Sequence, residues 1–359
     1  MNNFDATDWI RRHRTLALAA GAVIAAVLLI WAVESLVRHR APAAMPGNKS
    51  GFQVVGFYEN KTPHDGMPSS RVSFDAHWRQ LTQVSPLWFS VNPDGTVVDT
   101  GYDSSLVSAA HQHHIPVVPL FVNAQGSSRV LMSQATRLKA VDSIAAVIKQ
   151  DNLDGASIDF ELLKPQSRTD LSLFMQDAAN KLHPLKKILA VSVFPLAGLP
   201  TSINGAYDYH ALARSADYLV IMAYDHHYSG GPPGPVAPYG WVRRSIQAAL
   251  QQAPANRLVL SIGMYGYDWV NKGAASAAPT VADVTAKGMA RSYGVPIRYH
   301  ARESQNQFAY TKNGTPHVVW FMGDRSAKAR LALAKQYHLD GISLWRLGME
   351  DPAFWRVVP

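Results

Sequence analysis

The sequence of 359 residues contains no cysteine and is poor in charge. Without cysteine the chain cannot form disulfides, thiolate nucleophiles, iron–sulfur clusters or cysteine-ligated zinc sites. Only 17% of the residues are charged while 47% are hydrophobic, which excludes a disordered chain and a coiled coil. The net charge is +8, but the basic residues are scattered and form no Lys/Arg-rich run in the folded part, so we expect no nucleic-acid partner.

A long apolar stretch, Thr15–Val37, contains Glu34 as its only charge. Crossing the hydrocarbon layer of a bilayer requires a helix of about 20 apolar residues, so we predict a transmembrane signal anchor here. A cleaved signal peptide with its cleavage site within Ala41–Ala44 is the alternative.

The anchor divides the chain into four parts. Residues 1–14 would be a cytoplasmic N-terminus, residues 15–37 the anchor, and residues 38–51 a linker rich in small residues and proline. Residues 52–359 would then form the main folded domain, on the periplasmic or extracellular side of the inner (plasma) membrane, to which the chain is bound as a single-pass protein.

After the linker, short apolar runs with β-type residues alternate with amphipathic helical segments, as in a parallel sheet crossed by helices. Eight such runs indicate an α/β fold, a closed (β/α)8 TIM barrel. The expected strands are Val54–Tyr58, Leu87–Val91, Pro116–Val122, Gly155–Phe160, Ile188–Phe194, Tyr218–Ala223, Leu258–Met264 and Gly341–Trp345. The expected helices include Val130–Gln150, Arg168–Leu182, Trp241–Gln252 and Ser326–Tyr337.

The gap before the last expected strand is longer than the others. It contains Phe308–Thr311 and His317–Phe321 on either side of Asn313-Gly314, which is the pattern of a β-hairpin. We therefore expect a small α+β insertion at about residues 271–322.

The fourth expected strand carries acidic side chains. In a strand, Ser157, Asp159 and Glu161 point to one face, and the apolar residues between them point to the other. Buried carboxylates cost several kcal/mol, and active sites of such barrels lie at the C-terminal ends of strands, so this face is a candidate active site. The structural alternative places Glu161 in a surface loop and pairs Asp159 with a basic side chain.

The run DGASIDFE, residues 154–161, resembles the D-x-x-D-x-D-x-E motif of family 18 glycoside hydrolases, the chitinase-type barrels. Met222–Asp225 resembles the family's Met-x-Tyr-Asp at the end of strand six, and Trp345 is placed like the Trp that ends strand eight. Met264–Trp269 and Leu344–Pro352 are similar to the branch that contains spore-cortex glucosaminidases and hydrolase modules fused to polysaccharide deacetylases and glycosyltransferases.

This resemblance implies a glycosidase that cleaves N-acetylglucosamine-containing glycan, such as peptidoglycan, chitin oligomers or exopolysaccharide, without a cofactor. It implies a retaining mechanism in which Glu161 protonates the glycosidic oxygen and the substrate's acetamido oxygen attacks the anomeric carbon. Asp159 would accept the acetamido N–H, Tyr224 would donate to the acetamido oxygen, and Trp345 would stack on the sugar. The alternative is a glycan-binding protein of the same ancestry that has lost turnover.

Four further residues are expected to contact the substrate: Asp225, Ser157, Tyr58 and Tyr265. Ser157 departs from the family pattern, which has aspartate at this position. We expect its hydroxyl to donate a hydrogen bond that keeps Asp159 ionised.

No metal site is expected. The histidine cluster has no partner at ligand spacing and is better explained by a solvated or helix-end role; its members are His111, His113 and His114. His226 and His227 follow Asp225 and serve either sugar contact or loop structure. Asp351 with Pro352 predicts a helix start with Asp351 as N-cap. Nothing in the sequence sets the oligomeric state.

Overall fold

The computed structural model describes residues 51–60, 69–270 and 277–358. The predicted transmembrane helix, the N-terminal 14 residues and the linker up to residue 50 lie outside the described residues. Within the described ranges, no helix combines the length and the apolar character needed to span a bilayer.

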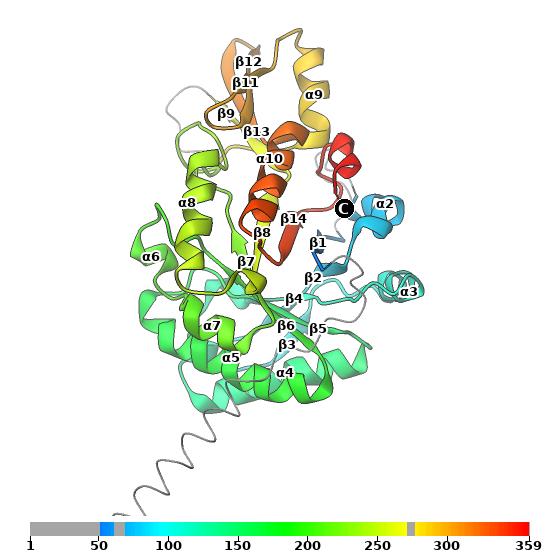
Figure 1. The fold of residues 1–359 in the computed structure, drawn as a ribbon, viewed down its shortest axis with the longest axis vertical. Coiled ribbons are helices and arrows are strands. Elements are labelled where there is room, and N and C mark those ends of the chain that lie inside the picture. The colour runs from blue at the N-terminus through cyan, green and yellow to red at the C-terminus, as the bar shows by residue number, and fades with distance from the viewer. Residues whose placement is uncertain (1–50, 61–68, 271–276, 359) are drawn as a thin grey trace, which may run out of the picture. The chain divides into compact units, whose positions relative to one another are not determined.

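Eight parallel strands form a closed barrel, which confirms the predicted architecture (Figure 1). In spatial order they are β1 (Gln53–Tyr58), β14 (Gly341–Trp345), β8 (Leu258–Gly263), β7 (Tyr218–Met222), β6 (Ile188–Val193), β5 (Gly155–Asp159), β4 (Leu120–Asn123) and β2 (Gln83–Val91). Parallel pairing of β1 with β2 closes the ring. A short strand, β3 (Val97–Asp99), pairs antiparallel with the C-terminal end of β2.

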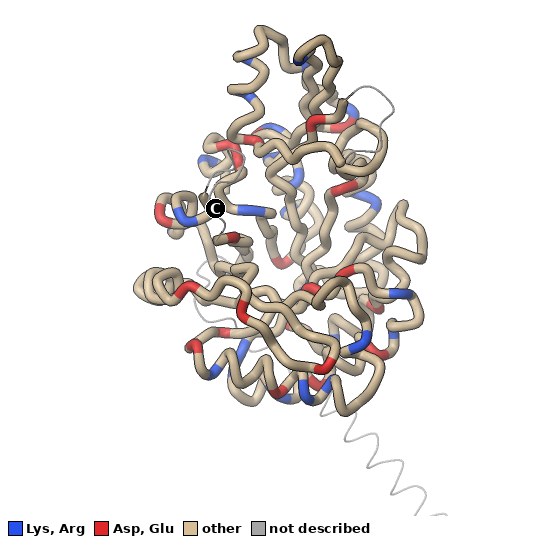
Figure 2. Tube along the Cα trace, turned by 180° about the vertical axis from the view of Figure 1, so that it is seen from behind, with Lys and Arg blue, Asp and Glu red and all other residues tan. Residues whose placement is uncertain are grey.

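Helices surround the barrel and carry acidic and basic residues in mixed order, as the view from behind shows (Figure 2). They are α2 (Ser70–His77), α3 (Ser104–Gln112), α4 (Gln134–Gln150), α5 (Arg168–Leu182), α6 (Thr201–Asn204), α7 (Tyr209–Ser215), α8 (Tyr239–Leu250) and α10 (Gly323–Gln336). The predicted bounds of α5 are confirmed. Short 3-10 turns lie between elements, and the last of them, Pro352–Arg356, begins after the predicted cap Asp351, whose carboxylate accepts from Ala353 N–H.

A hydrogen bond across the barrel identifies which side chains face its interior. Gln83 Nε2 on β2 donates to Tyr218 OH on β7 at 2.6 Å, and these two strands are not neighbours. Side chains alternate along a strand, so Tyr224, six residues after Tyr218, continues the interior face beyond the end of β7. On β5, the buried Ser157 and Asp159 are the interior residues, as the sequence predicted.

A second, antiparallel sheet stands at the C-terminal end of β8 (Figure 1). Its order is β10 (Thr280–Ala282), β9 (Tyr265–Val270), β13 (Thr315–Phe321), β12 (Gln305–Lys312), β11 (Arg298–His300). The predicted hairpin is confirmed: β12 and β13 pair through a turn in which Asn313 and Gly314 both have positive φ.

The predicted start of the insertion, residue 271, is wrong. Only Met264 separates β8 from β9, so the insertion begins at Tyr265. The chain passes from one sheet into the other without a turn, so no proline or polar cluster marks the boundary, and the glycines beside it, Gly263 and Gly266, lie within the strands themselves. A helix, α9 (Asp283–Ser292), covers one face of the second sheet through Ala286 and Ala290.

Candidate active site

Glu161 lies two residues beyond the end of β5, and its backbone is fixed from two sides. The amide of Asn123, at the end of β4, accepts from Glu161 N–H and donates to Glu161 C=O, both at 2.9 Å. Tyr207 OH donates to the carbonyl of Phe160 at 2.7 Å. Because these bonds hold the chain that leads to Glu161, its carboxyl is positioned at the mouth of the barrel.

Asp159 is buried beneath Glu161, with 8% of its surface exposed. Burial raises the pKa of Asp159, and the hydroxyl of Ser192 on β6 opposes that shift. The expectation that Ser157 would keep Asp159 ionised is therefore wrong. Ser157 Oγ is buried and has no hydrogen-bond partner among the described residues, and Ser157 lies two residues before Asp159, deeper in the barrel.

The surroundings of Glu161 favour its protonated form. Burial raises the pKa of Glu161, and the negative charges of Asp159 and Asp225 raise it further. A carboxyl that keeps its proton towards neutral pH is suited to donate that proton to a leaving group. This arrangement assigns Glu161 the chemistry of a general acid.

Asp225 is held by two tyrosines of the insertion. Tyr265 OH and Tyr267 OH donate to the same oxygen, Asp225 Oδ1, at 2.5 and 2.9 Å. Burial raises the pKa of Asp225, while these two donors oppose the shift. Asp225 itself has a φ of 59°, an uncommon conformation for a non-glycine residue and one that recurs at functional sites.

Tyr224 and Trp345 complete the group. The ring of Tyr224 contacts the ring of Tyr265 edge-on at a centroid distance of 6.1 Å, and burial with nearby carboxylates raises the pKa of its hydroxyl well above 10. Tyr224 therefore acts as a neutral hydrogen-bond donor. Trp345 ends β14, pairs in register with Gly263 and contacts Phe57 edge-on at 5.4 Å.

Tyr58 does not join this group, and its expected contact with substrate is wrong. Phe57, the preceding residue, faces Trp345, so alternation turns Tyr58 to the helix side of β1. Burial there raises the pKa of the Tyr58 hydroxyl to about 12, with Asp103 of the α3 cap adding to the effect. The alternation along β1 was readable from the sequence, but which of its faces pointed inward was not.

The structure adds residues that the sequence did not single out. Tyr267 could have been found, because it shares a strand face with Tyr265 in a run that already resembled the family. Asn123 and Tyr207 gave no signal, since each acts on the backbone of a residue about forty positions away.

The two histidines after Asp225 make contacts within their own part of the fold. His226 contacts Trp241 edge-on at 4.9 Å, and His227 Nδ1 lies 3.0 Å from the carbonyl of Pro232. In the part of the chain that the structure describes, no group of three or more His, Asp, Glu or Cys side chains is arranged to hold a metal ion.

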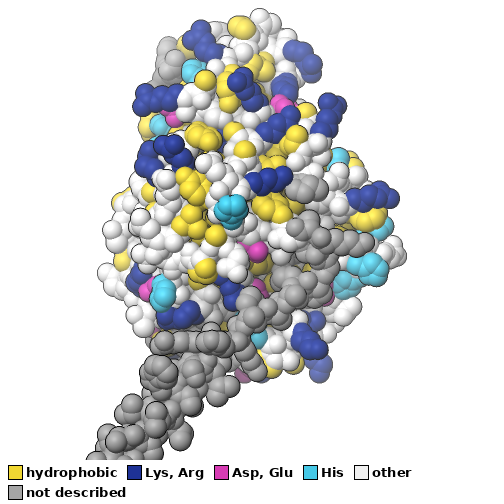
Figure 3. Space-filling view, in the orientation of Figure 1, with side chains coloured by type: hydrophobic (Ala, Val, Ile, Leu, Met, Phe, Trp, Pro, Cys, Tyr) yellow, Lys and Arg dark blue, Asp and Glu magenta, His cyan; other side chains and the backbone are white. Residues whose placement is uncertain are grey.

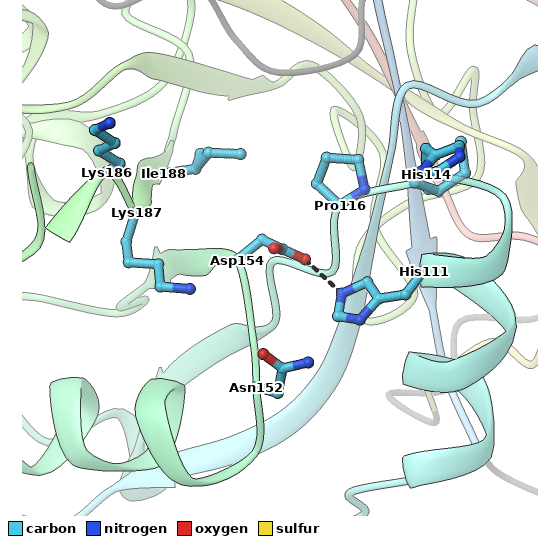
Figure 4. A pocket seen from close by; sticks show the side chains of 9 residues that line it. His111, His114, Pro116, Asn152, Asp154, Lys186, Lys187 and Ile188 are labelled. Atoms are coloured by element: carbon cyan, nitrogen blue, oxygen red, sulfur yellow. Dashed lines mark hydrogen bonds and ion pairs between the residues drawn. The ribbon is translucent and has the colours of Figure 1, made fainter.

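His111 lies in the last turn of α3, at the opposite end of the barrel strands from Glu161. His111 Nε2 lies 2.8 Å from Asp154 Oδ2, which also accepts from Val117 N–H at 2.8 Å (Figure 4). This pair lines a cavity of about 460 Å³ together with His114, Lys186 and other residues. The cavity lies at the N-terminal ends of β5 and β6 and is remote from Glu161.

The chain was compared with known proteins. The model of glycosyl hydrolases family 18 matches residues 53–350. The chain is 28% identical over 296 residues to the cortical fragment-lytic enzyme of Bacillus anthracis, covering 77% of this chain and 67% of that protein. It is 26% identical over 306 residues to the di-N-acetylchitobiase of Rattus norvegicus, covering 76% and 78%.

Solved structures agree with this match. The Bacillus cereus spore cortex-lytic enzyme SleL has a TM-score of 0.79 at 26% identity, over 87% of this chain and 74% of that one. A chitinase from Chromobacterium violaceum has a TM-score of 0.78 at 27% identity, over 86% and 98%. Together with the acidic, tyrosine-lined mouth of the barrel, these matches show that the chain belongs to glycosyl hydrolases family 18 and is a glycosidase.

Proposed function

We propose that the chain hydrolyses an N-acetylglucosamine-containing polysaccharide with retention of configuration, using the substrate's acetamido group as the nucleophile. The observation that carries the proposal is the state of the three carboxyl groups. Burial and neighbouring charge favour a protonated Glu161, Asp159 lies buried beneath it, and Asp225 is occupied by two tyrosine donors. We infer from these surroundings that Asp159 and Asp225 assist the reaction and that neither attacks the anomeric carbon.

The steps follow from these positions. Glu161 donates its proton to the glycosidic oxygen as the bond to the anomeric carbon breaks. The acetamido oxygen attacks the same carbon and closes an oxazolinium ring, whose N–H binds to Asp159 and whose positive charge that carboxylate stabilises. Tyr224 donates to the acetamido oxygen and orients it before attack. Water, deprotonated by Glu161, then opens the ring and restores the acid.

The relatives support a polymer of N-acetylglucosamine as the substrate. Their names describe lysis of cortical fragments, cleavage of di-N-acetylchitobiose and degradation of chitin. For this chain, peptidoglycan, chitin-type oligomers and poly-N-acetylglucosamine exopolysaccharide all present the acetamido group that the mechanism requires. The surroundings of Glu161 favour its protonated form. A protein that only binds glycan does not need a protonated carboxyl at this place, so this feature favours an enzyme over a glycan-binding protein.

We further propose that the catalytic domain is tethered to the inner membrane by residues 15–37 and acts on the periplasmic or extracellular side. The support is the apolar length of that segment alone. The full chain should pellet with membranes and resist extraction by salt. Mature protein that begins near Ala44 would contradict the anchor and show a cleaved signal.

The acetamido group is the test of mechanism. We expect cleavage of oligomers of N-acetylglucosamine, followed by mass spectrometry of products, and no cleavage where the reacting sugar is deacetylated. A thiazoline analogue of the oxazolinium should inhibit, because it mimics the intermediate's shape and charge. Cleavage at deacetylated sugars, with an ester intermediate trapped on Asp225, would overturn the mechanism.

A further inference from the structure

The second sheet has one face covered by α9 and another that continues from the active site. Phe308, Val319 and Phe321 pack against Ala286 and Ala290 of α9 on the covered face. Tyr267, which donates to Asp225, lies on the other face, because it alternates with the residues that face α9.

Strand register extends that second face outward in a straight row. Tyr267 on β9 pairs with Trp320 on β13, Trp320 pairs with Gln307 on β12, and Gln307 pairs with Arg298 on β11. Residues directly opposite one another in antiparallel strands project to the same side, so these four side chains form one row. It crosses three strand spacings, about 14 Å.

The row combines an aromatic surface with hydrogen-bonding groups. His300 contacts the ring of Trp320 at a centroid distance of 4.5 Å, and its Nε2 lies 3.4 Å from Gln307 Oε1. Trp320, His300 and Gln307 are half-buried, and Arg298 is exposed. An aromatic ring flanked by an amide and a guanidinium suits a sugar chain, whose faces are apolar and whose edges bear polar groups.

Among the described residues of the insertion, the exposed charged side chains are basic. Its three described acids are buried or half-buried: Asp268 accepts from Tyr310 and His317, Asp283 is 1% exposed, and the half-buried Glu303 lies 3.7 Å from Arg302. Exposed basic residues include Arg291, Arg298 and Lys312, and no carboxylate of the described residues lies within ion-pair distance of these three. Figure 3 shows basic side chains gathered over this upper part of the molecule.

We propose that the row Tyr267–Trp320–Gln307–Arg298, called here the insertion row, is an extended subsite that binds a carboxylate-bearing N-acetylglucosamine glycan beyond the reacting sugar. Trp320 stacks on a sugar, and Arg298 pairs with a carboxylate on the chain. The inference rests on the proposed function and deepens it, since it selects an anionic glycan over neutral chitin and over a cationic, deacetylated polymer.

The test compares three substrates with the full chain. The first is an aryl glycoside of N,N′-diacetylchitobiose, which we expect to be too short to reach Trp320 and Arg298, the outer part of the row. The second is a long neutral N-acetylglucosamine oligomer. The third is an oligomer of the same length in which alternate sugars carry a 3-O-lactyl carboxylate. For wild type, KM should be lowest on the third, and that advantage should shrink as salt rises.

Arg298→Gln should raise KM about tenfold on the carboxylated oligomer and leave kcat, the neutral oligomer and the short glycoside unchanged. Trp320→Ala should raise KM about tenfold on both long oligomers and spare the short glycoside. The matched controls are Arg291→Gln and Tyr293→Ala, exposed residues of the same insertion outside the row, which should behave as wild type.

Equal effects of Arg298→Gln on neutral and carboxylated oligomers would overturn the inference, and so would no effect on either. Trp320→Ala could also raise KM on the short glycoside as much as on the long oligomers. That result would show that Trp320 only supports Tyr267, and it would overturn the assignment of Trp320 to a subsite. If wild type cleaves none of the substrates, the proposed function fails. The affinities of the same variants for the two long oligomers, measured by calorimetry, then test the insertion row without turnover. The row is supported if Arg298→Gln weakens binding of the carboxylated oligomer only, and it is overturned otherwise.

Discussion

Asn123 holds Glu161 by both backbone groups, accepting from its N–H and donating to its C=O at 2.9 Å. The contact joins the ends of β4 and β5, neighbouring strands of the barrel. Both bonds are made to backbone atoms of Glu161, and neither involves its carboxyl. The general acid is thus positioned through its main chain. Its side chain can turn from the leaving group, to which it gives a proton, to the water from which it takes one.

Tyr207 should matter for rate as well as for stability. Tyr207→Phe leaves the Phe160 carbonyl without its donor next to Glu161, and we expect kcat to fall about tenfold, with a loss of about 1–3 kcal/mol in the free energy of unfolding. Tyr209→Phe is the control, because Tyr209 OH donates in the same way to Phe194 C=O. Similar melting temperatures but a lower kcat only for Tyr207→Phe are expected. Equal kcat in both variants would refute the positioning role.

Glu161→Gln should lower kcat by a factor of about 10² to 10⁴, since general acid catalysis contributes about that much. Affinity for an N-acetylglucosamine oligomer, measured by calorimetry, should change little because the amide has nearly the same shape. Glu303→Gln, a half-buried glutamate of the insertion, is the control. A fully active Glu161→Gln variant would remove Glu161 from the mechanism.

The pH profile should report the charge of Asp225. Its negative charge raises the pKa of Glu161, so Asp225→Asn should lower that pKa while keeping an acceptor for Tyr265 and Tyr267. Activity needs Glu161 protonated, and the basic limb of kcat/KM should therefore move to lower pH. Asp99→Asn, at an exposed position on β3, should leave the limb in place. If the basic limb does not move in Asp225→Asn, the charge of Asp225 does not influence the pKa of Glu161.

Two glycines should respond oppositely to alanine. A Cβ at Gly263 would lie 2.7 Å from the Tyr265 ring and 3.3 Å from Tyr224 Cβ, so Gly263→Ala should displace Tyr265 from Asp225 and lower kcat. Gly288 lies within α9 with nothing within 4 Å of a Cβ, so Gly288→Ala should stabilise the fold by about 0.5–1 kcal/mol with activity unchanged. Thermal melts and steady-state rates check both. Unchanged kcat in Gly263→Ala would show that the bond of Tyr265 to Asp225 is dispensable.

The sequence predicted the features that depend on local pattern. The eight barrel strands, the bounds of α5 and the hairpin turn at Asn313-Gly314 each follow from periodicity or turn chemistry over a few residues. The acidic face of β5 was also readable, because alternation in a strand is local.

The remaining features depend on contacts between distant residues. Alternation along β1 could not tell whether Phe57 or Tyr58 faces the interior, since the register of the whole barrel decides it. The clasp by Asn123 and the donor from Tyr207 join residues separated by 38 and 47 positions. The partner of Asp159 was also misjudged, because the hydroxyl beside it belongs to Ser192 on the neighbouring strand.

The direct passage from β8 into β9 through Met264 makes the insertion an electrostatic component of the catalytic group as well as a wall beside it. Tyr265 and Tyr267 fix Asp225, whose charge adds to burial and to Asp159 in raising the pKa of Glu161. A partial, reversible opening of the second sheet would release Asp225 and expose the mouth of the site to water, which would lower the pKa of Glu161 and reduce activity while the barrel stayed folded. On heating, turnover would then be lost at a lower temperature than the barrel structure. The temperature at which activity falls would report the local stability of the insertion.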